Sequence, residues 1–464
     1  MTSDDLVASL RELVGNEGPL QVARHAVNTA AIADWCDAIG DRNPRYPEIA
    51  PTATLDIWDR PGLPGQSAEY RNRDTPQSRA LRLLERNGFV GVVAVNSELE
   101  VTRALRPGDM VHNVQVLEDV SAEKQTALGV GHFVTTRHRY TTTGGEHVGD
   151  LRFRVLKFKP GTARAGGSPE SPAAPPLDSS PDARPRPGIN LDNEALWDGY
   201  RKHELRIPQC NRCTTMVFPP SPRCARCGAF DMGYAVASGR GTLYSFVSVH
   251  HPKAPGFDYP VPVGLVELDE GVRMVADLVG VTSAQLSVGM PLEVDWLDSH
   301  PALVDGATDS RGPITLARFR PAPPVPRTDT VTASSLAVGE TLPLWVLPVT
   351  PTLIVAGALA TRDFQDVHHD RDLAHKKGSK DIFLNINTSL GLMQRFVTDW
   401  AGPDAFVRAL RVRLGAPAYP YAPLTFTGSV GSVDAATGAV EVAVTATNAL
   451  GAHVTGTVEL EVAP

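Results

Sequence analysis

The pattern of hydrophobic and polar positions in residues 1–160 predicts helices followed by a long run of strands. Asn28 and Thr29 begin a first helix, whose apolar side chains recur at helical spacing, and Gly40 ends it. The pattern predicts a second helix at 75–88 and then strands at 97–104, 110–118, 126–142 and 148–158. This order predicts an α+β domain in which an antiparallel sheet wraps around one helix.

The same order of helices and strands returns in residues 331–464. Thr350 and Pro351 begin a helix that leads to a turn at Asp363. A longer helix covers about Thr388 to Trp400, and about three strands end the chain. We therefore predict a second domain of the same kind.

Short strands between these two domains predict a small β-barrel. They lie at 241–250, 261–268, 274–279 and 289–294, after a short helix at 195–200. Two stretches rich in Pro, 160–190 and 320–330, interrupt the pattern, and the first has too few bulky apolar residues to fold. We expect domains at 1–160, 191–322 and 331–464, with a disordered linker at 161–190.

Composition and charge exclude several classes of protein. The chain has 464 residues, of which 42% are hydrophobic and 21% charged, as expected for about three globular domains. No stretch approaches roughly eighteen uninterrupted apolar residues, and acidic residues occur near the start, so we expect no membrane span and no signal peptide. A cytoplasmic protein follows. The net charge of −8, and the 15 acidic against 12 basic residues in 191–322, give no reason to expect nucleic acid as a partner.

Four of the five cysteines form two closely spaced pairs in the middle domain. Cys210 and Cys213 are one pair, and Cys224 and Cys227 are the other. Two such knuckles present four thiolates tetrahedrally to Zn²⁺, and a site filled by four thiolates is structural because no coordination position stays open. Disulfides are the weaker alternative without a secretion signal, and a ribbon that has lost its metal is another. Cys36, on an apolar helical face, is expected in the core.

A stretch near the C-terminus, Arg362 to Asp370, places an aspartate five residues before a histidine. Asp363 and His368 cannot share one helical face at this spacing, so both reach one water only if the chain turns sharply between them. A carboxylate and a neutral imidazole that converge on one water can supply the base and the acid for adding water to an α,β-unsaturated thioester. We take Asp363 and His368 as the candidate catalytic pair, against the alternative of an ordinary surface pair.

A related stretch, Gly40 to Tyr46, lies near the N-terminus. Asp41 stands five residues before Tyr46, which is the same offset. Because an unperturbed tyrosine has a pKa of about 10, Tyr46 is a poor base at neutral pH. We expect Asp41 to cap or brace a turn there, and Tyr46 to take no part in proton transfer.

With these two motifs the chain resembles the MaoC-like, R-specific enoyl-CoA hydratase/dehydratase family, whose motif runs roughly Gly-Asp-x-Asn-Pro-x-His-x-Asp. The C-terminal copy keeps both aspartates and the histidine but lacks Asn-Pro. The N-terminal copy keeps Gly-Asp-x-Asn-Pro but has Tyr46 in place of the histidine. The resemblance implies a degenerate hot-dog domain at 1–160, a catalytic one at 331–464, and a CoA thioester as substrate.

The middle domain resembles a second family. The helix at 195–200 and the stretch 218–224, with the cysteine pairs, are similar to the zinc-ribbon and OB-fold proteins that accompany thiolase-like enzymes. The order hot-dog, ribbon/OB, hot-dog resembles a fusion of the two subunits of the actinobacterial steroid side-chain enoyl-CoA hydratase. This resemblance implies hydration of a steroid enoyl-CoA to a tertiary β-hydroxyacyl-CoA, a thiolase-like aldolase docked on the ribbon/OB domain, structural zinc and a homo-oligomer.

Other polar residues give weaker indications. Backbone N–H groups near Asn387 and Thr388, at the start of the long C-terminal helix, are candidates for binding the thioester oxyanion, with a plain helix cap as the alternative. His132 and His138 are expected at core or edge positions of a strand, and Lys376 and Lys377 are expected in solvent, although they could also meet CoA phosphates. His369 could equally be solvated or catalytic.

Three classes of function therefore remain for the whole chain. The Asp363 and His368 motif favours a hydratase acting on a steroid enoyl-CoA. A non-catalytic scaffold for an aldolase is the second class, and a hydratase for ordinary fatty enoyl-CoA is the third. Water addition to thioesters with and without a steroid nucleus distinguishes the three.

Overall fold

The computed structural model describes residues 3–46, 48–60, 63, 74–162, 181–299 and 313–464. The chain forms two compact units. One comprises Met1–Gly166 together with Pro324–Pro464, and the other comprises Gly167–Pro323. Residues 163–180 of the predicted linker lie outside the described residues. The expectation of disorder is wrong for its last part, because η3 (Pro181–Ala183) is ordered and Arg184 pairs with Asp277 at 2.6 Å.

The N-terminal half of the first unit contains helices and then a meander of strands. Its elements are α1 (Ser3–Arg11), β1 (Gln21–Val22), α2 (Thr29–Ile39), η1 (Thr52–Ile57), α4 (Pro76–Arg86), β2 (Gly91–Val101), β3 (Val111–Val120), β4 (Lys124–Thr126), β5 (Gly129–Thr142) and β6 (His147–Phe158). Asn28 caps α2 by accepting the N–H of Ala31, and Gly40 ends it in the left-handed region at φ 69°. Both predicted helices are confirmed.

The C-terminal half repeats this plan. Its elements are η5 (Ala333–Ser335), β14 (Trp345–Pro348), α6 (Pro351–Ala360), η6 (Asp366–His368), α7 (Arg371–Lys376), α8 (Ile386–Ala401), β15 (Phe406–Leu414), β16 (Pro423–Asp434), β17 (Ala439–Asn448) and β18 (Gly451–Glu461). Thr350 caps α6 at Leu353, with Pro351 in the first turn. The predicted long helix begins two residues earlier than expected, because Asn385 rather than a later residue caps it.

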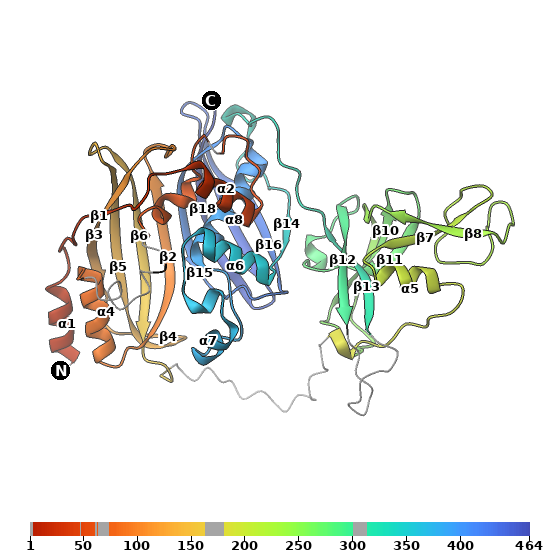
Figure 1. Cartoon of the computed structure of the whole chain (residues 1–464), viewed down its shortest axis with the longest axis horizontal. Helices are drawn as coiled ribbons and strands as arrows, with labels where there is room; N and C mark the ends of the chain where they lie inside the picture. The colour runs from red at the N-terminus through yellow and green to blue at the C-terminus, as the bar shows by residue number, and fades with distance from the viewer. Residues whose placement is uncertain (1–2, 47, 61–62, 64–73, 163–180, 300–312) are drawn as a thin grey trace. The chain divides into compact units, whose positions relative to one another are not determined.

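One continuous sheet joins the two halves. Its 11 strands follow the order β1-β3-β5-β6-β2-β15-β18-β17-β16-β14, with β4 beside β5. The two halves meet where β2 pairs with β15 antiparallel, for example Leu99 opposite Leu410. The two hot-dog domains therefore pair edge to edge within a single chain (Figure 1).

The main core lies between this sheet and the helices α2, α6 and α8. Buried side chains of both halves share it, including Trp35 of α2 and Leu392 of α8. Gly391 lets these two helices approach, since a Cβ there would lie 2.2 Å from the Trp35 ring. A smaller core packs α1 and α4 against β3, β5 and β6.

The second unit contains a small ribbon and a barrel-like sheet. Its elements are η3 (Pro181–Ala183), α5 (Glu194–Tyr200), β7 (Leu205–Cys210), β8 (Met232–Ala237), β9 (Arg240–Val249), β10 (Val261–Leu268), β11 (Arg273–Asp277), η4 (Ser283–Gln285), β12 (Pro291–Ser299) and β13 (Ile314–Pro321). The ribbon is the β7-β8 pair, and the five-stranded sheet has the order β11-β10-β9-β12-β13. A bridge from Leu278 to Phe319 nearly closes the barrel.

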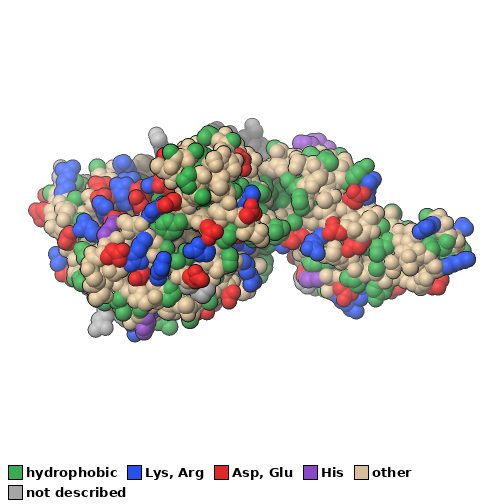
Figure 2. All heavy atoms as spheres, turned by 90° about the horizontal axis from the view of Figure 1, so that it is seen from above, with side chains coloured by type: hydrophobic (Ala, Val, Ile, Leu, Met, Phe, Trp, Pro, Cys, Tyr) green, Lys and Arg blue, Asp and Glu red, His purple; other side chains and the backbone are tan. Residues whose placement is uncertain are grey.

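The surface carries mixed charge. Figure 2 shows basic and acidic side chains interspersed over the visible face, with no continuous basic stripe on it. None of the helices in the described part of the chain has the length and apolar character that a membrane crossing requires.

Candidate active site and metal site

Asp363 and His368 come together just after helix α6. Thr361 ends the helix, and Arg362 takes the left-handed conformation at φ 56°, which turns the chain sharply as the five-residue spacing requires. Asp363 then faces η6, which carries His368. The Asp363 Oδ2 and His368 Nε2 atoms lie 3.6 Å apart, and the two side chains are only 11% and 7% exposed.

The hydrogen bond of His368 to Phe383 fixes which ring nitrogen carries the proton. Its Nδ1 lies 2.7 Å from the Phe383 carbonyl oxygen, which can only accept, so Nδ1 carries the proton. Burial lowers the pKa of His368, so the ring is neutral near pH 7 and its Nε2 lone pair faces Asp363. Two acceptors at this separation can both receive a hydrogen bond from one water molecule, which is the arrangement that water activation needs.

Asn385 supports this pair and was missed from the sequence. Its Nδ2 donates to Asp363 Oδ2 at 3.2 Å and to Thr361 Oγ1 at 2.7 Å. Its Oδ1 accepts the N–H of Thr388 at 2.9 Å, which makes it the cap of α8. The same residue therefore begins the helix and orients the carboxylate.

The two candidate oxyanion residues differ in the structure. The Thr388 N–H donates to Asn385 Oδ1, which is the helix cap that stood as the alternative for this group. The Asn387 N–H, one position earlier, has no acceptor among the described residues. It points from a helix N-terminus, where negative charge is favoured.

The side chain of Asn387 is held by the N-terminal half. Its Nδ2 donates to Asp56 Oδ1 at 2.6 Å, and its Oδ1 accepts from Arg60 Nη2 at 2.7 Å. Arg60 also donates to the Thr361 carbonyl at 3.2 Å and pairs with Asp56 at 2.7 Å. No sequence signal indicated Asp56 or Arg60, because they lie about three hundred positions from their partners.

The N-terminal motif forms a different local structure. Asp41 Oδ1 accepts the N–H of Asn43 at 3.1 Å, so it braces a turn as expected. The Tyr46 hydroxyl accepts from Gln394 Nε2 at 2.8 Å, and burial raises the pKa of Tyr46 well above its ordinary value. This tyrosine stays protonated near neutral pH.

The remaining polar candidates take ordinary positions. His132 is fully buried, and burial lowers the pKa of His138 to about 4. His369 lies at the surface, where its Nε2 approaches the Phe364 carbonyl. Lys377 pairs with Asp366 at 2.7 Å, and Cys36 is 8% exposed in the core, as predicted. Lys376 is exposed.

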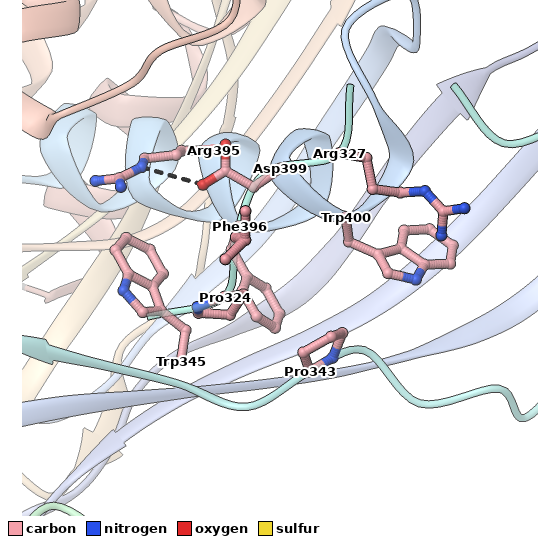
Figure 3. A pocket seen from close by; sticks show the side chains of 9 residues that line it. Pro324, Arg327, Pro343, Trp345, Arg395, Phe396, Asp399 and Trp400 are labelled. Atoms are coloured by element: carbon pink, nitrogen blue, oxygen red, sulfur yellow. Dashed lines mark hydrogen bonds and ion pairs between the residues drawn. The ribbon is translucent and has the colours of Figure 1, made fainter. Parts of the chain in front are cut away.

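A hollow of about 90 Å³ lies at the other end of α8 (Figure 3). Arg395 stacks over Trp345 at 4.7 Å there and pairs with Asp399 at 3.3 Å. Burial raises the pKa of Asp399 to about 6. Arg395 also donates to the Ile39 carbonyl, so this hollow borders the degenerate motif and not the Asp363 and His368 pair.

The four cysteines of the ribbon form one cluster. Their sulfur atoms all lie within 4.8 Å of one another, and the Cys210–Cys227 and Cys213–Cys224 pairs are each 3.6 Å apart. A tetrahedral zinc with Zn–S bonds of about 2.3 Å requires sulfurs about 3.8 Å apart. The donor set therefore fits a structural zinc.

Comparisons with known proteins agree with this geometry. A family model described as the FAS1-like dehydratase domain region matches residues 13–151. The alpha subunit of 3-oxo-4,17-pregnadiene-20-carboxyl-CoA hydratase from Mycobacterium tuberculosis is 39% identical over 290 residues, which are 60% of this chain and 89% of that subunit. The chain belongs to this enoyl-CoA hydratase family. The beta subunit is 57% identical over 123 residues, 26% of this chain and 94% of that subunit. This hydratase thus joins counterparts of both subunits in one polypeptide.

The second unit matches the family too. Models described as the ChsH2 rubredoxin-like zinc ribbon domain and the ChsH2 C-terminal OB-fold domain match residues 197–233 and 234–297. A relative named DUF35 domain-containing scaffold protein, from Pyrococcus furiosus, is 33% identical over 110 residues, 23% of this chain and 79% of the relative. The chain is therefore an enoyl-CoA hydratase with two hot-dog domains and a ribbon/OB-fold domain.

Proposed function

We propose that the hydratase adds water to the side-chain double bond of a steroid enoyl-CoA, with Asp363 and His368 activating the water. The observation that carries the proposal is the 3.6 Å approach of Asp363 Oδ2 to the unprotonated Nε2 of His368. Asp363 and His368 each accept a hydrogen bond from one water molecule. As the water oxygen attacks the β-carbon, the pair takes one proton from the water, and it then returns a proton to the α-carbon. The Asn387 N–H is the donor that stabilises the developing enolate oxygen.

The steroid substrate is proposed from the relatives. Both subunits of the Mycobacterium tuberculosis hydratase carry the name of a pregnadiene-20-carboxyl-CoA, and together they match most of this chain. Hydration at a ring-bearing β-carbon gives a tertiary alcohol. Such an alcohol has no hydrogen on its carbinol carbon, so it cannot be oxidised to the ketone that thiolysis needs, and retro-aldol cleavage is the remaining route.

The test compares two thioesters with the purified full chain. Water addition to a steroid enoyl-CoA whose side-chain double bond ends at a ring carbon should have a kcat/KM at least about a hundredfold above that for a straight-chain enoyl-CoA. Equal values would support the fatty enoyl-CoA alternative. No hydration of either thioester would leave only the scaffold alternative.

We further propose that the ribbon/OB unit holds one structural Zn²⁺ and docks a thiolase-like aldolase, which consumes the tertiary alcohol. The name of the Pyrococcus furiosus relative, a scaffold protein, supports a docking role. An exposed apolar row on the ribbon supports it too. Tyr234 and Val236 lie on one face of β8 and are 48% and 57% exposed, and Phe230, two residues before β8, is 74% exposed.

The docking proposal is tested by polar substitution in that row. Tyr234→Ser combined with Val236→Ser should abolish co-purification with a thiolase-like aldolase. Val288→Ser is the matched control, because Val288 is 68% exposed in the same unit but lies outside the row. Wild-type association of the double variant would exclude this face.

A further inference from the structure

The N-terminal half has Tyr46 in place of the histidine of its motif, yet its residues Asp56 and Arg60 form hydrogen bonds with the C-terminal half. Asp56 lies in η1, and Arg60 follows it by four residues. Both side chains are largely buried, at 11% and 23% exposure. A buried ion pair is expensive to maintain unless its remaining hydrogen bonds are satisfied, so its partners indicate its role.

Those partners flank the residue that holds the catalytic carboxylate. Arg60 donates to Asn387 Oδ1 and to the Thr361 carbonyl, while Asp56 accepts from Asn387 Nδ2. Asn387 is two residues after Asn385 on the first turn of α8. Thr361 Oγ1 accepts from Asn385 Nδ2, the same group that donates to Asp363. Asp56 and Arg60 therefore hold, by hydrogen bonds, both the end of α6 and the start of α8, the two segments that Asn385 also connects.

We propose that Asp56 and Arg60 are positioning residues of the hydratase: they fix the end of α6 and the start of α8, so that Asn385, Asp363 and the Asn387 N–H keep their geometry. The inference rests on the proposed roles of Asp363 and His368. It gives the degenerate half a function in catalysis that requires no proton transfer of its own.

The guanidinium also affects the base electrostatically. Burial is the largest cause that lowers the pKa of His368. Asp363 and the Phe383 carbonyl raise this pKa, while His369 and the Arg60 cation lower it further. Loss of Arg60 should therefore have two separable effects. Misplacement of the reacting groups lowers kcat, and loss of the positive charge raises the pH at which His368 becomes protonated.

The experiment is Arg60→Met in the full chain, assayed with an enoyl-CoA that the wild type hydrates. We expect kcat to fall about ten- to hundredfold, KM to change little, and the acid limb of the rate profile to move to higher pH. Arg103→Met is the matched control. Arg103 also bridges two carboxylates of the same half, Asp109 and Glu146, but contacts none of the residues above. It should leave kcat and the acid limb unchanged.

Arg60→Lys separates geometry from charge, and it serves if the methionine variant does not fold. Lysine keeps the positive charge but cannot donate as a planar fork to two acceptors. It should lower kcat while the acid limb stays at its wild-type pH. Wild-type kcat in either Arg60 variant would overturn the inference, as would an equal loss in Arg103→Met. An inactive wild type would instead contradict the proposed function.

Discussion

At the scale of single residues, the two motifs differ by what surrounds an aspartate with the same spacing. Asp363 Oδ2 accepts a hydrogen bond from Asn385 and lies next to the unprotonated Nε2 of His368. Asp41 instead accepts a backbone N–H in a turn, and burial raises its pKa. The residue five positions after each aspartate determines whether the motif can accept a proton. The neutral imidazole of His368 can accept one near pH 7, and the buried phenol of Tyr46 cannot.

Removing either member of the pair should abolish most of the activity. Asp363→Asn and His368→Ala should each lower kcat at least about a hundredfold, since an amide cannot take a proton from water and alanine has no imidazole. Tyr46→Phe is the control, because it removes only the hydroxyl that accepts from Gln394. It should keep kcat within about twofold, although losing this hydrogen bond should cost about 1 kcal/mol of stability. Near-wild-type turnover in His368→Ala would contradict the assignment.

The pH dependence of the free enzyme follows from the same environment. Burial lowers the pKa of His368, so its neutral form, which is the proposed base, persists below the ordinary histidine value of about 6.5. The acid limb of kcat/KM should therefore have its midpoint below about pH 6.5. A midpoint clearly above this pH, measured at constant ionic strength, would show that His368 is not the titrating base.

At the scale of elements, local signals were sufficient for helices α2 and α6. Asn28, Gly40 and Thr350 act as caps within one turn of their helices, so the sequence alone indicated them. Helix α1 was not predicted, because it is nine residues long and depends on packing Leu6 and Leu10 into the small core.

Contacts distant along the chain were beyond prediction from one sequence. Asn385 lies 22 positions after Asp363 and was not singled out, although the helix next to it was. Its position as cap becomes significant only once the turn at Arg362 brings Asp363 beside it. Asp56 and Arg60 had no signal, because an aspartate and an arginine one turn apart usually form a surface pair.

The packing of α2 against α8 gives a prediction at this scale. Gly391→Ala should destabilise the first unit by about 1–3 kcal/mol, because the new Cβ would lie 2.2 Å from the Trp35 ring, whose side chain is fully buried. Alanine is otherwise the better helix former, so the sign of the change in stability depends on this contact. Gly144→Ala, where the nearest atom is 3.8 Å away, should change stability little. Urea unfolding followed by tryptophan fluorescence measures both, and a more stable Gly391→Ala would contradict the contact.

At the scale of the whole molecule, the residues proposed for hydration and the cysteines of the proposed zinc site lie in different units. The β2 and β15 pairing makes both hot-dog domains one sheet, so the degenerate half cannot be detached without exposing a central strand. Among the described residues, the strands of the ribbon/OB domain form their own two sheets, and the domain has its own core. Asp363, His368 and their supporting residues all belong to the first unit.

This separation predicts the effect of removing zinc. Cys210→Ser with Cys213→Ser should reduce zinc from one per chain to none by elemental analysis, because two of four thiolates are lost. The ribbon should become sensitive to proteolysis, while hydration stays within about twofold of the wild type. Cys36→Ala is the control, since Cys36 lies in the core of the first unit, and it should retain zinc. Loss of hydration in the double variant with the first unit still folded would show that the two units depend on each other.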